Sequence, residues 1–327
     1  MNRLIAIFVL VLSSLNVWSQ YAPQAGIAGS TAVPASSQLI MSWANHCSLQ
    51  RGWLNIQQKS LGFTSSGDST LAIGFFDHSV VSLGDSGVAT LSFPSMIMNG
   101  AGADFVVFEN GFTNPNNTEE AFLELAFVEV SSDNVHFTRF PAHSLTQTNT
   151  QIAGSGVYMN ARLINNLAGK YVSGFGVPFD LEELNGSPNL DVDHITQVRI
   201  VDVVGAIDEW GCKDDSNHLI NDPYPTDFPT GGFDLDAVGV LHQQPNSVED
   251  ISRLNVAFYP NPANDFLIIE SKEPIQICLT DLQGRVLVVE NIIALSKLDI
   301  SRIERGIYGI QFTNKEGKRW ARTFTKI

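Results

Sequence analysis

The sequence has few cysteines. Only Cys47, Cys212 and Cys278 occur in 327 residues, so they cannot all pair with one another. Two alternatives are compatible with the large N-terminal part: a Cys47–Cys212 disulfide, or two buried free thiols. Cys278 alternates with Ile275 and Ile277, and this spacing predicts a small core residue of a strand.

Basic residues are also scarce. The chain carries 19 Lys and Arg against 34 Asp and Glu, a formal net charge of −15. The imbalance lies in residues 1–245, with 24 acidic and 8 basic residues, whereas residues 253–327 have 8 acidic and 11 basic. Without a basic stripe to neutralise phosphates, we expect no nucleic-acid partner. The acidic part is compatible with cation binding, and also with charge that only keeps the protein soluble.

Several motifs and segments are missing. The sequence has no paired His-Glu zinc motif, no Walker loop and no dinucleotide fingerprint. The N-terminus places an apolar run, Leu4 to Leu12, after Arg3 and before small and polar residues, which is typical of a secretory signal peptide cleaved after Ser19. No later segment is long and apolar enough for a membrane helix, so we expect no transmembrane segment in the mature chain.

Helical periodicity is almost absent. Short apolar or alternating runs separated by turn residues predict an all-β sandwich. One short helix is expected within 37–53 and a single helical turn at 179–184. The expected strands include Val88–Phe93, which Pro94 is expected to end, and Ala103–Asn110, Phe122–Val130 and Thr196–Val204.

The segment 231–240 is expected to be a strand with two different faces. Phe233, Leu235 and Ala237 point to one side, and Asp234 and Asp236 point to the other. Residues 208–230 form an acidic stretch with too many prolines for regular structure. A strand beside a long polar loop is a common place for a binding site.

The carboxylates of this region predict a calcium site. Calcium takes six to eight oxygen ligands, including carboxylates and loop carbonyls. No EF-hand spacing is present, and the alternative is a solvated acidic loop with outward-facing strand carboxylates. The predicted metal ligands are Asp202, Asp222, Asp234, Asp236 and Glu109.

Trp210 is the predicted centre of a ligand site. An exposed aromatic ring among polar groups suits stacking on a sugar, and the surrounding set is Asp208, Glu209, Asn217 and His218. A second hypothesis pairs Glu109 with Asp202 or Asp236 for glycosidic cleavage, as a hydrolase or lyase. A third is a purely structural surface protein.

Two resemblances concern the large part of the chain. Residues 130–137 and Val198-Arg199-Ile200-Val201 resemble the galactose-binding-like, discoidin-type jelly roll. A longer set resembles a family of uncharacterised bacterial cell-surface proteins over residues 43–241, and this resemblance implies export. Its motifs are Val81–Gly84, Asn99–Asn110, Leu167–Lys170 and Gly232–Val238.

The C-terminal segment has the clearest resemblance. Residues 258–263 read Phe-Tyr-Pro-Asn-Pro-Ala, and strand-like blocks follow at 266–270, 275–287, 298–301 and 306–312. The order and spacing are similar to the C-terminal sorting domain of type IX secretion substrates in the Bacteroidetes. This resemblance implies a small Ig-like β-sandwich that engages the type IX machinery and is often removed afterwards; the alternative is an Ig-like module that is retained.

The expected protein is therefore all-β, a jelly-roll β-sandwich followed by a small Ig-like β-sandwich. The expected divisions are a signal peptide at 1–19, a cell-surface domain at 20–242, a linker at 243–252 and a sorting domain at 253–327. We expect a secreted or outer-membrane surface-attached, non-catalytic binding or adhesion module. Its expected ligand is an extracellular glycan or another surface ligand, and calcium is expected to stabilise the acidic loop.

Overall fold

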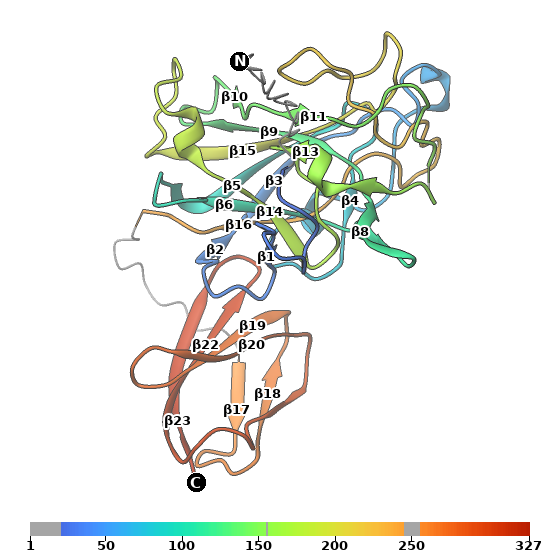
Figure 1. Ribbon diagram of the computed structural model, residues 1–327. Coiled ribbons are helices and arrows are strands. Elements are labelled where there is room, and N and C mark those ends of the chain that lie inside the picture. Colours follow the sequence, from blue (N-terminus) through green and yellow to red (C-terminus); the bar gives the residue numbers. More distant parts are fainter. Residues whose placement is uncertain (1–20, 155, 245–255) are drawn as a thin grey trace, which may run out of the picture.

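The computed structural model describes residues 21–154, 156–244 and 256–327 (Figure 1). The predicted signal peptide lies outside these residues, as does most of the predicted linker. The described chain is almost entirely antiparallel β structure, and the prediction of an all-β sandwich is confirmed. Its helices are single 3-10 turns too short to cross a membrane: η1 (Lys59–Leu61), η2 (Ser69–Ala72), η3 (Ala161–Leu163) and η4 (Leu181–Leu184).

Two antiparallel sheets form the larger unit (Figure 1). The first has the order β1 (Val33–Pro34), β14 (Phe175–Phe179), β6 (Phe105–Glu109), β16 (Asp234–Val240) and β2 (Ser42–Trp43), with β4 (Val81–Ser82) also paired to β16. The second has the order β10 (Thr138–Arg139), β9 (Ala126–Ser131), β15 (Ile195–Asp202), β5 (Val88–Ile97) and β3 (His46–Gln50).

Small sheets lie outside these two layers. One pairs β11 (His143–Ser144) with β13 (Ile164–Asn165), and the other joins β12 (Met159–Asn160), β8 (Asn117–Phe122) and β7 (Phe112–Asn114). Their strands lie between β6 and β14 in the sequence, as do β9 and β10 of the second sheet. Residues 166–170 follow β13 and lead toward β14.

The core of the larger unit lies between the two sheets. Alternate residues of facing strands meet there because successive side chains of a strand point to opposite faces. Fully buried contributors include Phe105 and Val107 of β6, Leu91 of β5, and Val198 and Ile200 of β15. Cys47 is buried in this core, all three cysteines are free, and no Cys47–Cys212 disulfide forms.

The C-terminal unit is a smaller two-sheet sandwich with its own core (Figure 1). One sheet has the order β17 (Val256–Tyr259), β18 (Phe266–Ser271) and β21 (Ser296–Asp299). The other has the order β20 (Val286–Ile292), β19 (Ile275–Thr280), β22 (Gly306–Asn314) and β23 (Arg319–Lys326). Lys315 forms an ion pair with Asp77, which links the two units.

Pro94 does not end the strand that contains it. β5 continues to Ile97, and its ladder with β15 shifts register between Ser92, which pairs with Gln197, and Ile97, which pairs with Ile195. Pro94 lies in this irregular stretch, where the ladder does not need the backbone N–H that proline lacks. The predicted strand end at Pro94 is wrong for this reason.

Two further sequence predictions need correction. Residues 37–53 contain no helix. They form β2 and β3, which lie at the edges of the two sheets and pair with β16 and β5. The run 122–130 is not one strand, because β8 ends at Phe122 and β9 begins at Ala126. The helical turn expected at 179–184 is confirmed as η4, capped by the Asp180 side chain.

β16 differs from the expected two-faced strand. Leu235 and Val238 pack in the core between the sheets, whereas Ala237 packs in a separate cluster with Trp43. A register shift against β6 between Leu235 and Ala237 reverses the alternation, as a β-bulge does. The acidic face is also not solvated, because Asp234 and Asp236 are both buried.

Candidate functional site

Five carboxylates are buried where the two sheets meet at one end of the sandwich. Glu109 ends β6, Asp234 begins β16 and Asp202 ends β15, while Glu124 precedes β9 and Asp222 lies in the acidic loop. We call these five residues the carboxylate cluster. Asp202 bridges the layers, because its Oδ1 accepts a hydrogen bond from the Phe233 N–H at 2.7 Å.

Backbone N–H groups hold several of these carboxylates in place. The Glu109 Oε2 accepts from the Gly111 N–H at 2.7 Å, and the Asp222 Oδ2 accepts from the Leu125 N–H at 3.1 Å. The other oxygens, Glu109 Oε1 and Asp222 Oδ1, are buried and have no hydrogen-bond partner among the residues that the structure describes. An unpaired buried polar atom is costly, so these two oxygens mark a place where a partner is expected.

Burial dominates the electrostatics of the cluster. It raises the pKa of Glu109, Asp202 and Asp222 well above the ordinary values. Burial also raises the pKa of Glu124, and the nearby charge of Asp234 raises it further. No Lys, Arg or His of the described chain forms an ion pair with the cluster. The cluster therefore needs protons or a bound cation to balance its charge.

The structure brings together four of the five predicted metal ligands. Asp236 lies further along β16, where its Oδ1 accepts from the Asp77 N–H at 3.2 Å. Glu124 was missed by the sequence prediction, although a charged residue inside an apolar run is a signal that could have found it. In the parts of the chain that are described, no three Asp, Glu, His or Cys side chains are arranged to hold a metal ion.

Other acidic residues of the loop act as hydrogen-bond acceptors for backbone. The Asp208 Oδ1 accepts from the Trp210 N–H at 3.0 Å, and the Asp214 Oδ2 accepts from the Ser144 N–H at 3.0 Å. The Asp215 Oδ2 accepts from the Ala142 N–H at 2.6 Å. Part of the acidic run therefore fixes the loop rather than forming a ligand site.

The predicted Trp210 site is divided in the structure. Trp210 is 42% exposed on a turn with Asp208 and Glu209. Asn217 and His218 instead line a shallow pocket of about 430 Å³ to which Trp210 does not contribute. We call this the loop pocket; it is lined by Ser144, Leu145, Thr146, Thr148, Lys213, Asn217, His218 and Leu219.

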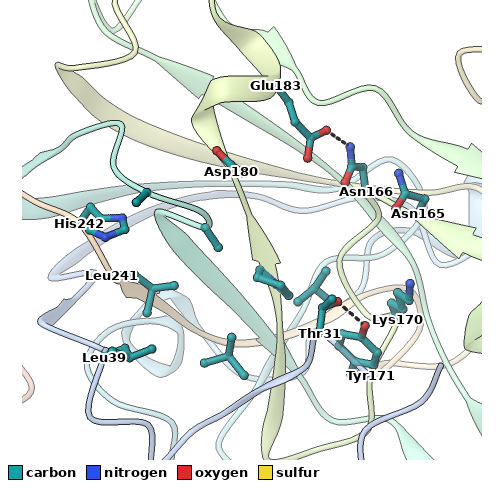
Figure 2. Close-up of a pocket in the computed structure, with 15 residues that line it drawn as sticks. Thr31, Leu39, Asn165, Asn166, Lys170, Tyr171, Asp180, Glu183, Leu241 and His242 are labelled. Carbon is teal, nitrogen blue, oxygen red and sulfur yellow. Dashed lines mark hydrogen bonds between the residues drawn. The ribbon is translucent and has the colours of Figure 1, made fainter. Parts of the chain in front are cut away.

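A larger pocket of about 570 Å³ lies over β14 (Figure 2). We call it the main pocket. Its polar lining is Thr31, Asn165, Asn166, Lys170, Tyr171, Asp180, Glu183 and His242. Its apolar lining is Val33, Leu39, Ala101, Ala103, Val177, Pro178 and Leu241.

Internal hydrogen bonds order the walls of the main pocket. The Asn166 Nδ2 donates to the Glu183 Oε2, and Figure 2 shows these two side chains meeting at one wall. The hydroxyls of Thr31 and Tyr171 are 2.8 Å apart on another side. Burial raises the pKa of Glu183, the Asn166 bond lowers it, and the charge of Asp180 raises it.

Lys170 is the buried cation of the main pocket. Lys170 is 4% exposed, and burial lowers the pKa of its ammonium group to about 8. The segment 167–170 belonged to a family resemblance in the sequence, but nothing in the residue pattern placed Lys170 with Asn166 and Glu183. Their meeting depends on how residues 165–170 and η4 pack around β14.

Comparisons with known proteins say little about the larger unit. The search of curated proteins found no match. Similar solved structures include the β-glucuronidase from Ruminococcus gnavus in complex with D-glucaro 1,5-lactone and in complex with uronic isofagomine. Both are 10% identical with a TM-score of 0.22, and they cover 88% and 94% of this chain. The chain spans only 44% and 45% of those chains, and so low a TM-score carries no information about fold or function.

The C-terminal unit gives a specific result. It is a two-sheet sandwich with a separate core, as the sequence resemblance implied. Residues 257–325 match the family model of the secretion system C-terminal sorting domain. The match supports a type IX sorting tail that interacts with the type IX machinery, and the protein is therefore secreted or attached to the cell surface.

Proposed function

We propose that the protein is a non-catalytic binding protein whose larger unit holds a carbohydrate in the main pocket. The observation that carries this proposal is the meeting of hydrogen-bond donors and acceptors in one concave site. Lys170 and Asn165 offer N–H donors, and Asp180 and Glu183 offer carboxylate acceptors. Sugar hydroxyls both donate and accept, so a carbohydrate uses both kinds of group.

The size of the pocket supports the same proposal. Its volume of about 570 Å³ lies within the roughly 300–1,000 Å³ of known small-ligand pockets. The apolar lining, which includes Val177 and Leu241, offers surface to the C–H faces of a sugar ring. We propose that the fold of the larger unit is the galactose-binding-like jelly roll that the sequence resembles.

Catalysis by the predicted carboxylate pair is less compatible with the geometry. Glycosidic cleavage places two carboxyl groups on either side of the scissile bond, with the substrate between them. Glu109 and Asp202 are 1% and 2% exposed and line neither the main pocket nor the loop pocket, so a polysaccharide cannot reach them without opening the sandwich. A binding function requires no such opening, because the main pocket is accessible.

We propose further that the carboxylate cluster binds a divalent cation, and that calcium is the ion its chemistry favours. The unpaired Glu109 Oε1 and Asp222 Oδ1 support this, because each belongs to a carboxylate whose other oxygen is fixed by a backbone N–H. A ligand set made only of oxygen atoms suits calcium. Because no three side chains of the described chain are arranged to hold a metal ion, ion binding would have to draw the carboxylates together.

A glycan-binding assay with matched variants tests the main-pocket proposal. The full-length protein is expected to bind members of a polysaccharide panel in a plate or calorimetric assay. Glu183→Gln should weaken that binding about tenfold, because it removes a charged acceptor. Glu182→Gln is the matched control: Glu182 is the preceding residue, carries the same charge and bonds Asn99 and Asn185 instead of lining the pocket.

The outcomes separate the alternatives. If the protein binds a glycan and both variants keep the wild-type affinity, the ligand binds outside the main pocket. Release of reducing ends from the panel by the wild-type protein, lost in Glu183→Gln, would overturn the non-catalytic assignment in favour of a hydrolase. No binding and no product release would leave a structural surface protein.

A further inference from the structure

Lys170 presents a cation to the main pocket without an anionic partner. In the described chain its ammonium group takes part in no ion pair and no hydrogen bond of its Nζ is present, and the residue is 4% exposed. The Tyr171 ring centroid lies 5.4 Å from the Nζ and the Tyr21 ring centroid lies 6.0 Å away. These aromatic faces offset part of the cost of burial, but they do not neutralise the charge.

The carboxylates of the same pocket do not supply the missing anion. The Glu183 Oε2 accepts from the Asn166 Nδ2. No carboxylate oxygen lies within ion-pair distance of the Lys170 Nζ in the described chain. Figure 2 shows Lys170 beside Tyr171, Asn165 and Asn166 between Lys170 and Glu183, and Asp180 further away. The main pocket therefore has a cationic side and an acidic side.

We infer that the ligand of the main pocket is an acidic carbohydrate whose carboxylate or sulfate group pairs with the Lys170 ammonium. This inference rests on the proposed function and adds the chemical class of the ligand. Asp180 and Glu183 would repel the ligand's acid group and accept hydrogen bonds from its hydroxyls. The pocket thereby fixes one orientation, with the acid group toward Lys170 and the hydroxyls toward η4.

The experiment compares ligands that differ only in charge. Galacturonic acid oligosaccharides are compared with the same oligosaccharides after reduction of their carboxyl groups, and a sulfated galactan with its desulfated form. Each pair is titrated against the full-length protein and against Lys170→Met, which keeps an unbranched side chain, one atom shorter than lysine, without the charge. Lys213→Met is the control, because Lys213 is exposed and lines the loop pocket.

The expected result is that an acidic oligosaccharide binds at least tenfold more tightly than its neutral counterpart. Lys170→Met should remove that difference, while Lys213→Met keeps it; the carboxylate and sulfate arms show which anion the pocket accepts. Equal affinity for acidic and neutral forms, unaffected by Lys170→Met, overturns the inference and leaves carbohydrate binding intact. Binding of no member of either pair overturns both. If Lys170→Met does not fold, the ratio of the wild-type protein's affinities for the acidic and neutral oligosaccharides still tests whether the pocket prefers an acidic ligand.

Discussion

Gly169 is packed directly against the backbone of Glu124. A Cβ atom on Gly169 would stand 1.8 Å from the Glu124 carbonyl oxygen, and the residue has a φ of +81°. Lys170 follows immediately, and Glu124 belongs to the carboxylate cluster. One tight backbone contact therefore joins the segment that carries Lys170 to the segment that carries Glu124.

Gly169→Ala is expected to destabilise the larger unit strongly. The new Cβ meets a backbone atom that cannot rotate away, and the positive φ is unfavourable as well. We expect a loss of about 3 kcal/mol or more in the free energy of unfolding, measured by denaturant titration. Gly174→Ala is the control, because Gly174 has a φ of +85° but no atom within 4 Å of its Cβ position. It should cost only about 1 kcal/mol, and equal losses in the two variants would contradict the steric account.

Lys170→Met is expected to stabilise the protein at neutral pH. Burial lowers the pKa of Lys170 to about 8, whereas an unfolded chain gives lysine a pKa of about 10.4. Between these values the unfolded chain binds more protons, so the free energy of unfolding of the wild-type protein rises with pH. The penalty of the buried cation is complete below pH 8 and relieved as the pH approaches 10.4.

The measurement is the difference in free energy of unfolding between Lys170→Met and wild type at two pH values. At pH 7 the variant should be more stable by about 1–3 kcal/mol, and at pH 10 the difference should be clearly smaller. A residue kept for structure would behave in the opposite way. Destabilisation by Lys170→Met at pH 7 would show that Lys170 supports the fold rather than a ligand.

The sequence was sufficient for the fold class because alternation and turn residues are local signals. It was less informative where tertiary packing determines the end of a strand or the burial of a side chain. Pro94 reads as a strand end, but an irregular ladder tolerates it. Asp234 and Asp236 read as solvent-facing, yet other segments cover them.

The candidate sites show the same limit. Carboxylates at the strand ends, such as Asp202 and Glu109, could be grouped from sequence because those ends meet at one end of a sandwich. Lys170 and Glu183 could not, since they come from a loop and a 3-10 turn whose approach depends on the packing of β14. The exposed ring of Trp210 has chemistry suited to sugar stacking, but its chemistry alone does not create a concave surface.

Chelation is expected to lower the thermal stability of the purified protein at pH 7.5. A cation that binds only the folded state raises its apparent stability, by roughly 2.7 kcal/mol at one hundred times the dissociation constant. For a unit of this size we expect a change in melting temperature of about 5 °C or more, restored by calcium. A melting temperature that responds to neither chelator nor calcium would contradict the proposal that the carboxylate cluster binds a cation.

Two Asp→Asn variants locate the ion. Asp222→Asn replaces the carboxylate that carries the unpaired Oδ1, and it should abolish the response to calcium. Asp215→Asn changes a loop carboxylate that accepts from the Ala142 N–H, and it should leave the response intact. Loss of the response in both variants would contradict the location of the ion in the carboxylate cluster, because Asp215 is not a member of it.

Trp210→Ala separates the two candidate ligand sites. Trp210 is 42% exposed and does not line the main pocket, so its truncation should change glycan affinity less than twofold. Asn166→Ala should reduce affinity about tenfold, because it removes an amide and frees the Glu183 side chain that the amide holds. Calorimetric titration of both variants with the same oligosaccharide gives the comparison. The reverse result would place the ligand on the turn of Asp208, Glu209 and Trp210, where an exposed ring rather than a pocket would provide the contact.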